Sequence, residues 1–190
     1  TAAGDIQVNF AVMQWYGNFL QAFKANVKNS AISDTLILQE IASVIDVDNV
    51  IVSPTQAQLN FALNMLSCFA GGVIKDSTFA RFSLAASGAY VNQVNYNKGI
   101  EFLRVRSVSL TNRANGTTGT WTATQNIDCK WTDTENIGGR LLSTGGQRDT
   151  FTNFGYADLF SGATQTATAQ YAFVLSGGCV SPFISGVNFL

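Results

Sequence analysis

The chain has 190 residues, of which 12% are charged and 46% hydrophobic, with a net charge of −1 and no histidine. The absence of histidine excludes Ser-His and Cys-His nucleophiles and imidazole metal sites. Because no block of basic residues is present to neutralise phosphates, nucleic-acid binding is not expected. The length predicts one domain over 1–190.

The first 95 residues are predicted to be mainly helical. Helices over 5–28 and 34–45 follow from apolar residues that recur at spacings of three and four, and the pair would form a helical hairpin. Ser53 and Pro54 match the N-cap and first-position preferences of a third helix. For 76–94 a fourth helix is favoured over strands.

Residues 96–190 are predicted to be mainly strands, because apolar and polar residues alternate with period two. Strands over 102–110 and 120–131 are joined by a turn-rich loop, which predicts a hairpin. An uncharged strand is predicted over 164–176, and 177–190 as an irregular cover. No internal repeat is detected. The predicted fold class is α+β, with N-terminal helical hairpins packed on a C-terminal antiparallel sheet of long amphipathic strands.

No set of residues converges on a reaction, so we predict a non-enzymatic chain with no catalytic residues, metal or cofactor. Asp46 and Asp48, or Asp133 and Glu135, have the spacing of an acid and a base on one strand face. Both pairs flank turn-prone sequence, where Asp is favoured for backbone hydrogen bonding alone. The turn interpretation is therefore preferred.

Three cysteines, Cys68, Cys129 and Cys179, form an odd count without a C-x-x-C pair. This argues against a zinc site or a disulfide framework. A bridge between Cys129 and Cys179 stays open. Asn115 begins a glycosylation motif, which matters only in a secreted eukaryotic protein.

Three arginines lie near the predicted hairpin. Arg104, Arg106 and Arg113 form either a small basic face for lipid head groups or acidic sugars, or the solvated edge of a strand. The solvated edge is the preferred interpretation.

The order of predicted elements resembles the cytolytic (Cyt-type) bacterial crystal toxins and their fungal volvatoxin-like relatives. Residues 5–45 match the first helical hairpin of that family, 49–60 its strand running into a third helix, and 109–119 its turn between two long strands. The resemblance implies a single α+β domain that permeabilises membranes without catalysis.

Two predicted strands, 120–133 and 164–176, have the length and alternation of membrane-crossing strands, which need about 9–11 residues with one apolar face. The membrane-insertion candidates are Trp121, Ala123, Ile127, Trp131, Ala169, Tyr171, Phe173 and Leu175. Any half-buried sheet alternates in the same way, so a soluble core is the competing interpretation.

The predicted function is a secreted pore-forming cytolysin whose partners are a lipid membrane and copies of itself. Two alternatives remain open. One is a self-assembling structural protein, such as a capsid, pilus or surface-layer subunit, which low charge favours equally. The other is a carbohydrate-binding module that uses Trp121, Trp131 or Tyr171.

Overall fold

The computed structural model describes residues 25–33, 35–41, 44–54, 61–81, 90–109, 119–157 and 173–189. Within these ranges the chain forms eighteen β-strands and no helix, and the strands pair in parallel in both sheets. The predicted α+β class with an antiparallel sheet is therefore wrong. The helix predicted over 5–28 lies almost entirely outside the described residues.

The smaller sheet contains one strand from each turn of the chain. Its neighbours follow in chain order, each paired in parallel with the next. The strands are β2 (Leu36–Gln39), β4 (Leu63–Leu66), β7 (Tyr90–Asn95), β10 (Gly119–Thr124), β13 (Arg140–Thr144) and β16 (Phe173–Ser176).

The larger sheet branches from one long strand, β3 (Ile45–Val52), which also pairs with β1 (Asn26–Ile32). The first half of β3 starts one branch: β5 (Gly72–Lys75), β8 (Ile100–Leu103), β11 (Lys130–Thr132), β14 (Thr150–Thr152) and β17 (Phe183–Ser185). The second half starts the other: β6 (Thr78–Arg81), β9 (Arg106–Ser109), β12 (Glu135–Ile137), β15 (Gly155–Ala157) and β18 (Asn188–Phe189).

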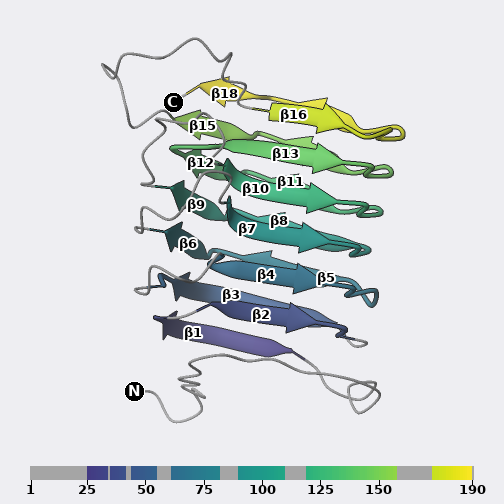
Figure 1. The fold of residues 1–190 in the computed structure, drawn as a ribbon. Coiled ribbons are helices and arrows are strands. Elements are labelled where there is room, and N and C mark those ends of the chain that lie inside the picture. Colours follow the sequence, from purple (N-terminus) through teal and green to yellow (C-terminus); the bar gives the residue numbers. More distant parts are fainter. Residues whose placement is uncertain are drawn as a thin grey trace.

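The chain therefore winds through three faces in turn and stacks each coil on the one before, as Figure 1 shows from β1 at the bottom to β16 and β18 at the top. Successive coils are 27, 29, 29, 20 and 32 residues apart, measured between the paired positions Leu36, Leu63, Asn92, Trp121, Leu141 and Phe173. A stack of parallel coils that each contact only their neighbours is a β-solenoid.

The coils turn sharply at residues with left-handed backbone conformation. At the corner between the two branches of the larger sheet, φ lies between +50° and +53° at Asn49, Asp76, Arg104, Asp133 and Asn153. Asn and Asp tolerate this conformation better than most residues, because their short polar side chains bond locally. Each such residue bends the chain and resets the inside–outside alternation of the strand that follows.

Every long insertion falls at one corner of the coil, between its third strand and the first strand of the next coil. The described strands leave eight to fifteen residues there, except between β12 and β13, where Gly138 and Gly139 make the whole connection. Most of the variation in coil length arises at this corner, and the neighbouring strands stay in register apart from one shift between Gly119 and Trp121.

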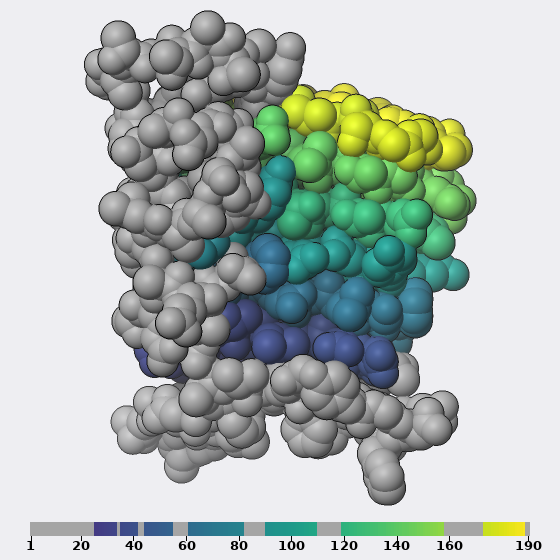
Figure 2. All heavy atoms as spheres, in the orientation of Figure 1, coloured from purple at the N-terminus to yellow at the C-terminus, as the bar shows by residue number. Residues whose placement is uncertain are grey.

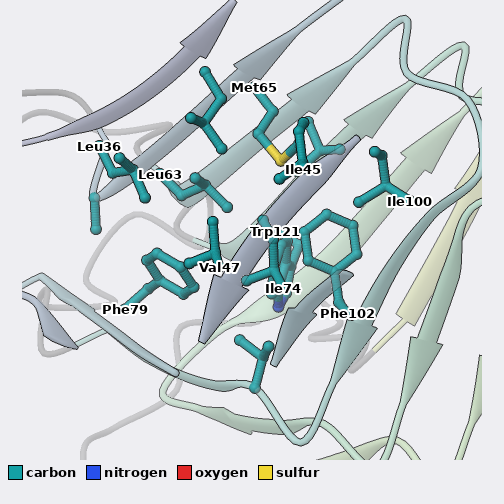
Figure 3. Close-up of a cluster of buried hydrophobic side chains, with 14 of the residues drawn as sticks. Leu36, Ile45, Val47, Leu63, Met65, Ile74, Phe79, Ile100, Phe102 and Trp121 are labelled. Carbon is teal, nitrogen blue, oxygen red and sulfur yellow. The ribbon is translucent and has the colours of Figure 1, made fainter. Parts of the chain in front are cut away.

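Apolar side chains from the three faces fill the inside of the stack (Figure 3). At its centre an aromatic column runs through three coils: Trp131 lies parallel to Phe102, at 5.0 Å between ring centroids, and to Phe151, at 4.8 Å. Trp121 meets Phe102 and Trp131 edge-on. Stacked and edge-on aromatic pairs contribute about 0.5–1.5 kcal/mol each beyond their buried area.

Corner residues explain why the helix predicted over 34–45 is wrong. Leu36 and Leu38 alternate inward along β2, then Glu40 turns the corner with φ +52° and Ile41 points inward again. The inward-facing residues Leu36, Leu38, Ile41 and Ile45 are therefore two, three and four residues apart. Spacings of three and four are those of an apolar stripe on a helix. The third and fourth predicted helices fail in the same way, since their described residues belong to β4 to β7.

The predicted hairpin is also wrong, because its two halves belong to different sheets. β9 pairs with β6 and β12, whereas β10 pairs with β7 and β13. The predicted strand over 120–131 is broken by positive φ at Gln125 and Asp128. Of the strand predicted over 164–176, residues 164–172 lie outside the described residues and 173–176 form β16. The irregular cover predicted over 177–190 is wrong, because this segment contains β17 and β18.

Candidate functional site

Charged side chains on the outside of the solenoid join adjacent coils. The Arg104 guanidinium donates to Asp76 with two hydrogen bonds of 2.6 and 2.8 Å, and the Arg148 guanidinium does the same to Asp128 at 2.7 and 2.8 Å. Arg104 holds the pKa of Asp76 below its ordinary value through this hydrogen bond. The basic and acidic partners lie one coil apart, so each pair ties two coils together.

Amide side chains form similar ladders. On the outside, Asn49 donates to the Asn29 side chain and Asn153 to Asp133, both at 2.9 Å. Inside, the side-chain oxygen of Asn97 accepts a hydrogen bond from the Cys68 backbone N–H at 2.9 Å. The backbone N–H of Asn97 in turn donates to the side-chain oxygen of Asn126, also at 2.9 Å. Inner asparagines thus satisfy backbone groups that a coil corner would otherwise bury without a partner.

The candidate acid–base pairs serve these ladders. Asp46 accepts from Lys28 at 2.7 Å, and Asp48 lies 3.2 Å from Lys75, both across neighbouring coils. Asp133 accepts from Asn153, and Glu135 lies 3.3 Å from Arg106. Each acid faces a cation or an amide one coil away, an arrangement suited to stacking the coils.

Of the three arginines near the predicted hairpin, the structure describes two. Arg104 and Arg106 are exposed but paired with Asp76 and Glu135, so they form links between coils. Arg113 lies outside the described residues, as does Asn115 of the glycosylation motif.

The described membrane-insertion candidates lie in three environments. Trp121, Ala123 and Trp131 are buried in the core, and Ile127 is half-buried beside a corner. Phe173 packs against the core, whereas Leu175 is exposed. Ala169 and Tyr171 lie outside the described residues. The alternation correctly placed Trp121, Ala123, Cys129 and Trp131 on one side, but that side is the interior of the coil.

The cysteines are free thiols, so the bridge left open between Cys129 and Cys179 does not form. Burial raises the pKa of Cys68 to about 11 and that of Cys129 to about 12. Since the thiolate is the nucleophilic form, these two thiols are unreactive near neutral pH.

One buried acid stands apart from the ladders. Asp149 is 2% exposed; one carboxylate oxygen accepts the Cys129 backbone N–H at 3.0 Å, and the other has no hydrogen-bond partner among the described residues. Burial raises the pKa of Asp149 to about 6, helped by the charge of Asp128 and opposed by the Cys129 hydrogen bond. Asp149 is thus an ionisable group buried inside the coil.

We expect Asp149 to make the protein less stable at pH 7.5 than at pH 5. Its folded pKa lies above the unfolded value, so its contribution to stability is full below pH 4 and is lost as the pH rises through 6. The whole loss is roughly 3 kcal/mol, and about half of it falls between pH 5 and pH 7.5. Asp149→Asn keeps an acceptor for Cys129 and should unfold in urea at nearly the same midpoint at both pH values. Equal wild-type midpoints would contradict this expectation.

The last described coil differs from the others. This terminal coil, residues 173–189, contains β16, β17 and β18 and forms the upper end of the stack (yellow in Figure 2). Its exposed apolar side chains are Leu175, Val180, Phe183 and Ile184. No sequence argument selected this surface, although the chain carries no charged residue after Asp158, a pattern that distinguishes it.

Comparison with protein-family models, curated proteins and solved structures finds no match. The described part of the chain contains no cluster of three or more potential metal-ligating residues. No helix in that part is long and apolar enough to cross a membrane. The solenoid and the exposed apolar side chains of its terminal coil are therefore the features on which a function can be argued.

Proposed function

We propose that this protein is a non-enzymatic structural component, a rigid β-solenoid that assembles with copies of itself. This is the second of the functions that the sequence predicts. The low charged fraction and the parallel stack of coils both support a scaffold. A location outside the cell fits the same composition and stays a prediction.

The supporting observation is that the charged and amide side chains of the described residues bond mainly to one another. Ion pairs such as Arg148–Asp128 and amide pairs such as Asn49–Asn29 join one coil to the next on the outside. Inside, Asn92 donates to the Ser107 hydroxyl at 2.7 Å and the Trp121 indole N–H to the Asn136 side chain at 2.7 Å. The outer pairs join successive coils and the inner ones join the faces of a single coil, as a rigid rod requires.

Pore formation stays a prediction that the fold does little to support. The residues that would enter the membrane include Trp121 and Trp131, which are fully buried between the faces of the coil. Moving them into lipid would require unstacking the coils, since their rings pack against Phe102. Burial also removes both tryptophans from sugar stacking, so carbohydrate binding loses two of its three proposed contacts.

The proposal is tested by combining electron microscopy with dye release from liposomes. We expect discrete assemblies larger than one chain in negative stain, and no release above the buffer control from neutral or anionic vesicles. A monomer at every concentration would overturn the structural role. Steep, concentration-dependent release would instead support the cytolysin.

A further inference from the structure

We infer that the terminal coil is a self-association surface, where a second copy of this chain docks end to end with the two terminal coils facing each other. This inference rests on the proposed structural role and names the surface and the partner. It is carried by the exposure of core positions, by sheet edges with which no described strand pairs, and by the absence of charge.

Two columns of inward-facing residues become exposed only at the terminal coil. Ile184 continues the column of Val47, Ile74, Phe102, Trp131 and Phe151, all of which are fully buried, yet Ile184 is 42% exposed. Leu175 continues the column of Leu38, Met65, Val94, Ala123 and Ser143, likewise buried, and is 36% exposed. Both side chains occupy core positions that another layer of side chains would cover.

The backbone at this end is equally unpartnered among the described residues. β16 ends the smaller sheet, and β17 and β18 end the two branches of the larger one. An edge strand presents a row of free N–H and C=O groups, which proteins usually protect with charged residues or proline. Here residues 173–189 carry no charge, and the one proline, Pro182, precedes β17 instead of lying within it.

Electrostatics favours a second terminal coil as the partner. In a two-fold contact the same patch faces itself, so a net charge on the patch would repel the same charge on its copy at a cost of several kcal/mol. A neutral apolar patch has no such cost and is complementary to itself. The other end of the described stack begins with β1, whose Lys28 is paired with Asp46 and would gain no partner from the uncharged terminal coil.

The test is sedimentation equilibrium of the 190-residue chain over a hundredfold range of concentration, with two charge variants. We expect wild type to reach twice the monomer mass and to stop there, because a two-fold contact closes. Ile184→Lys should raise the dimer dissociation constant by at least ~100-fold, since it would bury a charged ammonium group without a partner in an apolar, uncharged contact. Ile51→Lys is the matched control: Ile51 is an exposed isoleucine on β3, far from the terminal coil along the stack, and its variant should dimerise like wild type.

Each outcome is decisive. Circular dichroism establishes that both variants fold. If Ile184→Lys still dimerises, the terminal coil is not the interface, while the structural role stands on another surface. If wild type is monomeric throughout, both the inference and the structural role fail. A mass that keeps rising with concentration indicates a head-to-tail contact and overturns the two-fold arrangement.

Discussion

Replacing Gly72 with alanine is expected to destabilise the solenoid by about 3–5 kcal/mol. A Cβ at this position would overlap the Ile45 carbonyl oxygen and lie 2.6 Å from the Ile45 nitrogen and 2.8 Å from its Cα. All three atoms are backbone, so no side-chain rotation relieves the clash. Gly72 also has φ +144°, which alanine rarely adopts.

The control is Gly178→Ala in the terminal coil. Gly178 has φ +76°, but a Cβ there would have no atom within 4 Å, so only the backbone strain of about 1–2 kcal/mol remains. Urea unfolding followed by tryptophan fluorescence compares the two variants. If Gly72→Ala costs no more than Gly178→Ala, β5 does not approach Ile45 of β3 as closely as described.

Some of this interior could be predicted from sequence, because alternation survives within each short strand. The pattern placed Trp121 and Trp131 on one side of the chain, and both are in the core. The alternation failed at Gln125 and Asp128, because the backbone has a positive φ at each of them and turns there. Asp128 is a residue type that favours such turns, whereas Gln125 is not, so only half of that corner could be anticipated.

The repeat itself was hidden by substitution and insertion. Along one column of the smaller sheet the equivalent positions include Leu63, Asn92 and Trp121, which share no side-chain chemistry. The coil length falls from 29 residues to 20 where Gly138 and Gly139 replace a longer connection. A search at a fixed period therefore finds nothing, although physically each coil is the same unit.

The recurrence of Asn and Asp, which tolerate positive φ, carries more information about the coils than the hydrophobic pattern does. Asn49, Asp76, Asp133 and Asn153 occupy one corner on successive coils, with Arg104 interrupting the series. Such residues mark turns in any fold, so by themselves they indicate where the chain bends and not which strands pair. The self-association surface was missed for a related reason: Ile184 and Leu175 look like ordinary core residues until the register shows that no described strand follows theirs.

Removing the Trp131 ring is the second change expected to have a large effect. Trp131→Ala should destabilise the protein by about 4–5 kcal/mol, because a fully buried indole is lost from between two stacked rings. Since domains are typically stable by only 5–15 kcal/mol, much of the chain should then be unfolded at 37 °C. Circular dichroism against temperature measures the loss.

Phenylalanine variants separate ring stacking from hydrogen bonding. Trp131→Phe keeps a ring between Phe102 and Phe151 and removes an indole N–H that has no partner among the described residues, so it should cost only about 1 kcal/mol. Trp121→Phe removes the donor to Asn136 and leaves a buried oxygen unsatisfied, which adds about 1–3 kcal/mol. The two variants are compared by their urea midpoints. If both cost the same, the Trp121–Asn136 hydrogen bond does not contribute to stability; if Trp121→Phe costs more, the difference is the contribution of this polar link between two faces of the coil.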